Sequence, residues 1–540
     1  MAHRLPAIEK GAGPMSWHIY FVSKLFLAAH ERLQLEAWLN FPLALLVYWP
    51  IAQRPWRWVR ALLAWPAALA LAAHEVGTSI GPRLIQQLSQ LTEFSQSYAL
   101  ELGLRLLQDG FLPSLLALLL VSLWLNRWFR LDVLLCLSLL VLPLAASQRH
   151  AVQADSSMLN AGEAGPQNGA NFDPQARVQN FWRDEQQRAY PFVQGERPPF
   201  DVVLLHVCSL SWDDLDAIGL GRSALFDRFD LVFEQFNSVS SYSGPSMLRL
   251  LRANCGQTHH EDLYRPEDAR CGLLRQLTLA GYQVQAYLNH DGRFDGFADS
   301  LADETSVPVH TPVRLPGAQV ALQAFDGSPI GGDHATLAAW RSGVSSSTLP
   351  QALYYNTVTL HDGNRQPGGP AMEMADSYRL RLGHLMSDLD RFIGDIELSK
   401  RPTLVALLPE HGAALRKGAQ PIAGLRETPW PEITLVPVAV KLIGLDSLRP
   451  SGLQSPVRVS GPTSYLSFAA LLAELLSKPD PWDVLRTAPQ NLPRVPFVSD
   501  NGDSIVTLDE KAMWIRTASR GWQHLERLQK YSQLAHQEHP

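Results

Sequence analysis

The chain has 540 residues, a net charge of −6 at pH 7 and an isoelectric point near 6.3. It is too long for one ordinary domain, and its slightly acidic balance gives no indication of a nucleic-acid partner. Only four cysteines occur, namely Cys136, Cys208, Cys255 and Cys271.

Residues 1–146 contain five apolar segments that predict a membrane module of about five helices. The segments are Trp17–Ala29, Ala37–Ala52, Trp58–Ala73, Phe111–Leu125 and Val133–Ala146. Each is shorter than the ~20 apolar residues of an ideal span, but aromatic residues flank them as they do at membrane interfaces. The alternative, buried helices of a soluble domain, is disfavoured because so many uncharged runs are hard to bury in one small core.

Basic residues indicate how this module is oriented. Arg54 and Arg57 lie between the second and third segments, with Arg60 just inside the third, and Arg127 and Arg130 lie between the fourth and fifth; such basic loops prefer the cytoplasm. We therefore expect a cytoplasmic N-terminus and a periplasmic location for everything after Ala146. The loop His74–Gly110 would also be external and would hold an amphipathic helix. Lys24, inside the first segment, is expected to snorkel towards the interface, with contact to a lipid headgroup as the alternative.

Residues 147–199 are predicted to link the membrane module to a periplasmic catalytic domain at residues 200–540. Ser147–Asn171 has little to bury and reads as a flexible tether, and Pro174–Tyr190 has helical spacing. In the domain, apolar runs alternate with helical patterns. The expected strands are Val202–Val207, Gln283–Leu288, Leu353–Thr359, Thr403–Leu408 and Leu435–Leu442. The expected helices follow Pro245 and cover Ala371–Leu398 and Tyr465–Ser477. This alternation predicts an α/β fold with a mostly parallel sheet sandwiched by helices.

Three of these strands end at residues that can carry chemistry. Cys208 follows the first, His361 follows the third, and Glu410 and His411 follow the fourth. Ligands of parallel sheets bind at such carboxyl ends, and Cys, His and Glu are a reasonable ligand set for zinc. Each residue also has a structural alternative: a buried thiol, an imidazole that caps a turn, or a solvated Glu-His pair.

The cysteines favour the metal interpretation of Cys208. Cys255 and Cys271 flank a polar stretch and are the natural disulfide pair in an oxidising compartment, worth ~3 kcal/mol in the chain-entropy model. Cys208 is then left unpaired, and coordination as a thiolate would explain and protect it.

Ser243 begins a segment of helical spacing and precedes Gly244-Pro245, where a proline suits the first turn of a helix. A serine there is either a helix cap or a nucleophile, and a helix N-terminus favours a bound phosphate in either case. A nearby metal ion would lower the pKa of its hydroxyl and so activate it.

Together these residues resemble the cellulose phosphoethanolamine transferases of bacterial cellulose secretion systems (BcsG), over nearly the whole chain. The matching motifs are Cys208-Ser209-Leu210-Ser211-Trp212, Asn237-Ser238, Ser241-Tyr242-Ser243-Gly244-Pro245, Leu250-Leu251-Arg252-Ala253, Cys255-Gly256-Gln257-Thr258, Phe325-Asp326-Gly327-Ser328-Pro329, Leu360-His361-Asp362-Gly363-Asn364 and Pro409-Glu410-His411-Gly412.

The resemblance implies an alkaline-phosphatase/sulfatase-like fold with Ser243 as nucleophile. It implies zinc held by Cys208, Ser243, Glu410 and His411, a substrate site lined by Tyr242, His361 and Arg426, and a structural Cys255–Cys271 disulfide. The related lipid A enzymes use threonine as nucleophile and a carboxylate near the position of Cys208. The serine and cysteine of this chain therefore point to the cellulose branch.

The expected reaction is zinc-dependent transfer of phosphoethanolamine from phosphatidylethanolamine to glucosyl 6-hydroxyls of nascent cellulose, through a covalent intermediate on Ser243. His361 would act as general acid or base. The expected partners are the lipid donor, cellulose, the inner membrane and subunits of the cellulose synthase complex. Two alternatives stay open: transfer to lipid A or another envelope glycan, and a non-catalytic membrane scaffold. His290 and four other histidines have no assigned role.

Overall fold

The chain forms two compact units, Met1–Asn171 and Phe172–Pro540. The structure is a computed structural model that describes residues 15–29, 35–51, 53–76, 93–108, 110–129, 131–141, 172–192, 200–221, 226–266, 268–312, 320–369, 372–416, 423–453, 456–509, 512–517 and 520–526. The predicted tether Ser147–Asn171 lies outside these residues.

The first unit is helical throughout its described part. Its helices are α1 (Met15–Ala29), α2 (Ala37–Tyr48), α3 (Arg54–Val76), α5 (Gln96–Gln108), α6 (Phe111–Leu125) and a further helix over residues 131–141. All five apolar segments thus contain a helix, and α5 lies in the loop expected to hold an amphipathic one. Among the described residues, none of the helices has both the length and the apolar character needed to cross a membrane.

Lys24 does not snorkel, so that prediction is wrong. The side chain is buried, forms an ion pair with Glu75 of α3, and donates hydrogen bonds to Asn40 Oδ1 of α2 at 2.7 Å and to the Tyr20 hydroxyl at 3.0 Å. A buried ammonium is tolerated when it is paired and its donors are satisfied. The pairing carboxylate lies far away in sequence, so nothing near Lys24 in the chain indicates this arrangement.

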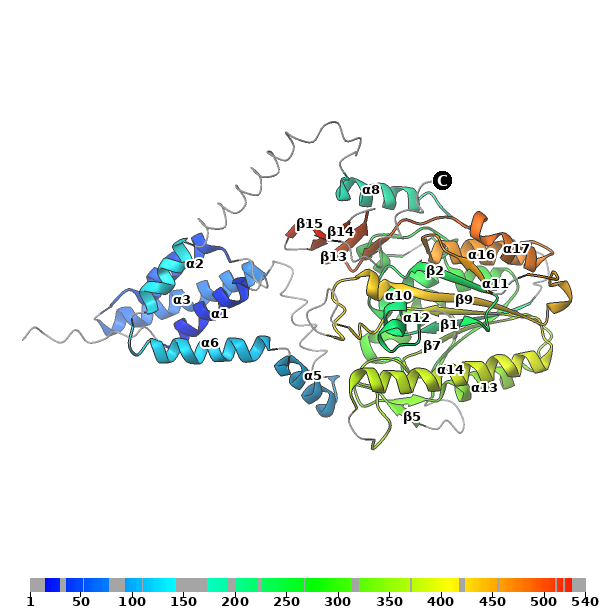
Figure 1. Ribbon diagram of the computed structural model, residues 1–540, viewed down its shortest axis with the longest axis horizontal. Helices are drawn as coiled ribbons and strands as arrows, with labels where there is room; N and C mark the ends of the chain where they lie inside the picture. Colours follow the sequence, from blue (N-terminus) through cyan, green and yellow to red (C-terminus); the bar gives the residue numbers. More distant parts are fainter. Residues whose placement is uncertain are drawn as a thin grey trace, which may run out of the picture. The chain divides into compact units, whose positions relative to one another are not determined.

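The second unit is an α/β domain built on one large mixed sheet (Figure 1). The strands of this sheet are β1 (Asp201–Val207), β2 (Leu231–Asn237), β3 (Gln283–Leu288), β4 (Val309–His310), β7 (Gln351–Thr357), β8 (Thr403–Pro409), β9 (Leu435–Ile443), β10 (Val457–Val459) and β11 (Thr463–Ser464). Their order is β10-β2-β9-β8-β1-β7-β3-β4, and β11 pairs with β2.

The mostly parallel character of the sheet is confirmed, with one exception at β9. The central strands β8, β1, β7 and β3 all run in the same direction, whereas β9 is antiparallel to both of its neighbours, β8 and β2. Each of the five predicted strands corresponds to an observed strand, with ends that shift by at most two residues. Because β8, β1 and β7 are parallel and in register, the residues that follow them meet at one edge.

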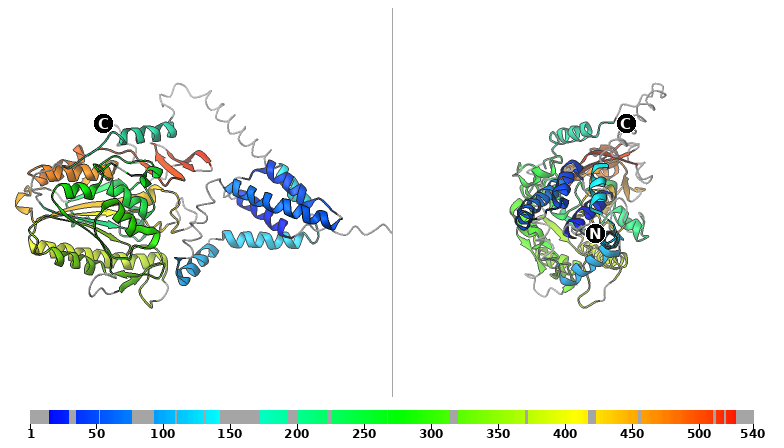
Figure 2. Two further views of the ribbon diagram at one scale, coloured as in Figure 1. Left: turned by 180° about the vertical axis from the view of Figure 1, so that it is seen from behind. Right: turned by 90° about the vertical axis from the view of Figure 1, so that its left-hand side faces the viewer.

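Helices cover both faces of this sheet, as Figure 1 shows and Figure 2 shows from behind. The helices of the unit are α8 (Pro174–Glu185), α9 (Trp212–Ala217), α10 (Ser243–Leu251), α11 (Leu273–Leu279), α12 (Phe297–Thr305), α13 (Asp333–Val344), α14 (Met374–Ser399), α15 (Pro431–Thr434), α16 (Tyr465–Ser477) and α17 (Pro481–Asn491). The helices α13 and α14 lie on one face, and α10, α11, α16 and α17 lie on the other.

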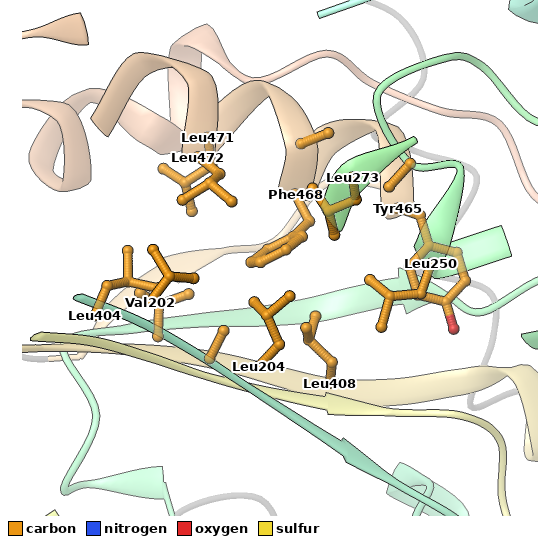
Figure 3. Packing of buried hydrophobic residues seen from close by; sticks show 14 of the residues in the cluster. Val202, Leu204, Leu250, Leu273, Leu404, Leu408, Tyr465, Phe468, Leu471 and Leu472 are labelled. Atoms are coloured by element: carbon orange, nitrogen blue, oxygen red, sulfur yellow. The ribbon is translucent and has the colours of Figure 1, made fainter. Parts of the chain in front are cut away.

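The core is divided by the pleat of the strands. Along β1, Val202 and Leu204 face the cluster that contains Phe468 and Leu472 of α16 (Figure 3). Val203, Leu205 and Val207 point to the opposite face, where they join the cluster under α13 and α14. A strand buried on both faces reads as a continuous apolar run, which is why these strands can be recognised in the sequence.

Two smaller sheets complete the unit. The first pairs β5 (Val320–Gln323) with β6 (Pro329–Gly331). The second is antiparallel and consists of β12 (Val498–Asp500), β13 (Ser504–Leu508), β14 (Ala512–Thr517) and β15 (Arg520–Glu526). The predicted helix Pro174–Tyr190 is the shorter α8, capped by Asp173, and its Phe181 and Trp182 pack with Leu466 and Val498.

Candidate active site

The residues predicted to hold a metal lie together at the carboxyl edge of the central strands. Cys208 follows β1, Glu410 and His411 follow β8, and Ser243 is the first residue of α10. Ser243 Oγ lies 3.5 Å from Cys208 Sγ and 3.3 Å from His411 Nε2. One ligand atom each from Cys208, Glu410 and His411 lie within 4.8 Å of one another, and all three side chains are buried.

Ser243 is not the cap of its helix. The N-cap position belongs to Tyr242, so the Ser243 hydroxyl is released from capping and points at the thiol and imidazole. The helix still contributes, because its unpaired N–H groups and dipole favour negative charge at this end. The hydroxyl therefore sits where a phosphoryl group would be stabilised.

The tautomer of His411 follows from its other ring nitrogen. Nδ1 lies 2.9 Å from the carbonyl oxygen of Gly412, which only accepts, and 3.2 Å from Arg426 Nη1, which only donates. The shorter contact assigns the hydrogen to Nδ1 and leaves the lone pair of Nε2 facing Cys208 and Ser243. Burial and the positive charge of Arg426 hold the pKa of His411 well below its usual value. The imidazole is thus neutral, the form that binds metals.

The donor set fits zinc. Burial raises the pKa of the Cys208 thiol to about 12 and that of the Glu410 carboxyl to about 7, because an isolated negative charge is costly in this site. Glu410 Oε2 is buried and has no hydrogen-bond partner of normal geometry within the described residues, although the nearby Ser243 hydroxyl and Cys208 thiol interact with the carboxyl and partly offset the effect of burial on its pKa. A thiol, a neutral imidazole and a carboxylate oxygen are zinc ligands, and a cation would compensate both anions and occupy the orphaned oxygen.

The three predicted substrate residues lie around this cluster. Arg426 donates from Nη1 to Ser209 Oγ at 3.1 Å and from Nη2 to His361 Nε2 at 3.3 Å. His361 donates from Nδ1 to the Asp362 carbonyl at 2.8 Å, and its ring stacks on Phe325. Burial, with the charge of Arg426 adding to it, lowers the pKa of His361 to about 4. Tyr242 is 42% exposed beside the serine.

A buried polar network supports the segment that leads to Ser243. Arg249 donates to Ser240 Oγ at 2.8 Å and to the Asp500 carbonyl at 3.4 Å, while Asn501 donates to Ser241 Oγ at 2.6 Å. Val239 has a φ of 69°, which a β-branched residue rarely adopts. Strain of this kind persists only where surrounding bonds fix the backbone, and here those bonds come from Arg249 of α10, from Asp500 at the end of β12, whose N–H donates to the Val239 carbonyl at 2.9 Å, and from Asn501.

Several buried residues beside the site are not among the predicted ones. His206 in β1 and Asn356 in β7 are buried polar residues inside apolar strands, which is a signal that the sequence does contain. Arg249 carries no such signal, because an arginine on a short helix is normally exposed. The predicted Cys255–Cys271 disulfide is confirmed, and Cys208 is a free, buried thiol.

Comparisons with known proteins agree with the resemblance found in the sequence. The family model for the cellulose biosynthesis protein BcsG C-terminal domain matches residues 160–522, and that for the BcsG N-terminal domain matches residues 17–144. The cellulose biosynthesis protein BcsG of Salmonella typhimurium is 30% identical over 96% of this chain and 97% of its own. The BcsG protein of Escherichia coli is 30% identical over 94% of this chain and 96% of its own.

Among solved structures, the chain is similar to the integral membrane protein lipooligosaccharide phosphoethanolamine transferase A from Neisseria meningitidis. The identity is 13%, the TM-score is 0.45, and the match covers 85% of this chain and 95% of that one.

Proposed function

We propose a function from one premise, that the chain belongs to the cellulose biosynthesis protein BcsG family. The protein transfers phosphoethanolamine from phosphatidylethanolamine to glucosyl 6-hydroxyls of nascent cellulose, with Ser243 as the covalent carrier. The observation that supports this most is the Ser243 hydroxyl, placed at a helix N-terminus within 3.5 Å of a thiol and an imidazole that suit zinc.

The proposed location is the inner membrane, with the second unit in the periplasm as a catalytic domain. Large apolar side chains are exposed on the helices of the first unit, among them Trp58 at 74%, Leu62 at 73% and Leu120 at 68%. Surface of this kind is stable against lipid or a partner protein and not against water. A membrane location also suits a lipid donor and contact with a cellulose synthase complex.

The proposed reaction has two displacements at phosphorus. Ser243 Oγ forms a bond to the phosphorus of the lipid, the bond from phosphorus to the diacylglycerol oxygen breaks, and diacylglycerol leaves with a proton. The 6-hydroxyl of a glucosyl unit then attacks the phosphorus, the bond from phosphorus to Ser243 Oγ breaks, and the proton of the 6-hydroxyl passes by way of His361 to the released Ser243 Oγ. Zn²⁺ held by Cys208, Glu410, His411 and Ser243 would lower the pKa of the serine hydroxyl and neutralise phosphoryl charge.

His361 and Arg426 have complementary parts in these steps. The Arg426 guanidinium presents donors that match phosphoryl oxygens, and the N-terminal N–H groups of α10 add to them. His361 is neutral and its Nε2 lone pair faces Arg426. Once Arg426 turns to the phosphoryl group, this lone pair accepts the proton of the attacking 6-hydroxyl as a general base.

Zinc affinity is expected to rise with pH, because bound protons compete with the metal. Burial holds the pKa of His411 well below its usual value, and it raises the pKa of Cys208 to about 12 and that of Glu410 to about 7, so zinc displaces a proton from the cysteine and, below about pH 7, a second one from the glutamate. The logarithm of the affinity constant should therefore rise by about two per pH unit below about pH 7, where two protons are displaced, and by about one above it. Competition with a chromophoric chelator measures this slope, and Glu410→Gln should reduce it to about one at low pH. An affinity independent of pH would contradict the assigned ligands.

The function is tested by phosphorus NMR of cellulose from cells that contain or lack this protein. A phosphoethanolamine signal that depends on the protein and disappears with Ser243→Ala supports the proposal. Modified lipid A beside unmodified cellulose would assign a different acceptor to the same chemistry. Unchanged cellulose and unchanged envelope glycans would leave a scaffold role instead.

A further inference from the structure

The two oxygens of the Glu410 carboxylate have different surroundings. Oε1 accepts a hydrogen bond from Asn356 Nδ2 at 2.5 Å and lies 3.4 Å from His206 Nδ1. Oε2 lies 3.7 Å from His411 Nε2 and makes no hydrogen bond of normal geometry in the described part of the chain. Oε1 is therefore fixed by a hydrogen bond, whereas Oε2 faces the Cys208 thiol, the Ser243 hydroxyl and the His411 imidazole.

The orientation of the Asn356 amide is fixed by His290. The Gly292 N–H donates to His290 Nδ1 at 3.2 Å, so the hydrogen of the neutral ring must be on Nε2. Nε2 then donates to Asn356 Oδ1 at 2.8 Å. With its oxygen occupied in this way, Asn356 can only turn its NH₂ group to Glu410. Three hydrogen bonds thus point in one direction, and each polarises the next.

The geometry of the sheet makes this relay rigid. The sheet order here is β8-β1-β7-β3, and Asn356 is in register with His206 of β1 and Leu288 of β3. The relay therefore crosses the carboxyl edge of the sheet from the end of β3, through β7 and past β1, to the end of β8. Asn356, His206 and Glu410 have no exposed surface, and His290 is 9% exposed, so water does not compete for these bonds.

We propose that Asn356 and His290 are positioning residues that restrict Glu410 to one-oxygen coordination, with Oε2 as the metal-binding atom. By occupying Oε1 they prevent the carboxylate from turning to bind with both oxygens, which keeps a coordination position open for substrate. Outer-shell hydrogen bonds orient metal ligands in this way, and their loss typically weakens metal affinity 10- to 100-fold. This inference rests on the zinc ligands of the proposed function.

The test compares two substitutions of His290 in the purified full-length chain. Glutamine can place an N–H where Nε2 donates, whereas leucine cannot. His290→Leu should weaken zinc binding about 10- to 100-fold in chelator competition. It should also change the visible spectrum of the Co²⁺-loaded protein, because a second carboxylate oxygen raises the coordination number and weakens the absorption. His290→Gln should keep both properties close to those of the wild type, and Asn356→Leu should behave like His290→Leu.

The outcomes separate this inference from the function. If the wild type binds zinc but His290→Gln and His290→Leu lose affinity equally, or if neither changes the Co²⁺ spectrum, the positioning role is wrong while the proposed function stands. Melting temperatures of the metal-free variants show whether a loss of zinc affinity arises from unfolding. If both His290 variants lose affinity equally because both melt at a lower temperature, the positioning role is also wrong. If the wild type binds no zinc, the metal site of the proposed function and the positioning role both fail.

Discussion

Ser243→Ala is expected to lower the rate of phosphoethanolamine transfer by about 10⁴-fold or more, the usual effect of removing a covalent nucleophile. The neighbouring hydroxyls cannot replace it. Ser240 Oγ accepts a hydrogen bond from Arg249, and Ser241 Oγ donates to the Arg426 carbonyl and accepts from Asn501. Both side chains are fully buried, so neither hydroxyl is accessible to a substrate.

Mass spectrometry of the intact protein measures this prediction directly. After incubation with phosphatidylethanolamine, the wild type should gain the mass of one phosphoethanolamine group, located on the peptide that contains Ser243. Ser346→Ala is a matched control, because Ser346 is exposed in the same unit and remote in sequence from the site. An adduct on the Ser243→Ala protein equal to that of the wild type would exclude this serine as the carrier. Cys208, Glu410 and His411 remain in this variant. A lost adduct with retained zinc therefore shows that these three ligands still hold the metal and that the missing group is the nucleophile.

The residues at the strand ends could be found from the sequence because the central strands are buried on both faces. Such strands appear as apolar runs, and the first polar residues after them mark the carboxyl edge. The register of β1 and β8 pairs Val207 with Pro409, which brings Cys208 beside Glu410. The sequence indicates that both residues follow strands, but the adjacency of those strands is a property of the sheet order. The antiparallel direction of β9 is hidden for the same reason, since an apolar run has no direction.

The supports of the site could not be predicted, because they join residues that are far apart in the chain. Arg249 is tied to Asp500, and His290 reaches Glu410 through Asn356. The error at Lys24 has the same origin, since its partner Glu75 comes from another helix. A local pattern indicates that a residue is polar and inside an apolar element. It does not indicate which distant group satisfies that residue, and here those distant groups determine the geometry.

Asp214 anchors the loop that follows His411, and its removal is expected to cause a large loss of stability. The carboxylate has no exposed surface and accepts hydrogen bonds from Ser211 Oγ at 2.8 Å, from the Ala413 N–H at 2.7 Å and from the Leu415 N–H at 3.2 Å. Burial raises the pKa of Asp214 to about 6. Desolvation of the charged carboxylate therefore outweighs the hydrogen bonds that favour the charged form. The cost of Asp214→Ala therefore comes from the donors left without an acceptor, at roughly 1–3 kcal/mol each before relaxation.

We expect Asp214→Ala to lower the free energy of unfolding of the metal-free protein by about 3 kcal/mol, allowing for partial relaxation of the loop. Urea denaturation measures this change. Asp216→Ala is the matched control, because Asp216 is an exposed carboxylate on the same helix, α9, and its loss should stay within about 0.5 kcal/mol. The Asp214→Ala variant should also release zinc faster than the wild type, because the backbone after His411 loses its hydrogen bonds to the Asp214 carboxylate. Equal stability of the two variants would show that the loop is fixed by the metal ligands and by packing, and not by the Asp214 carboxylate.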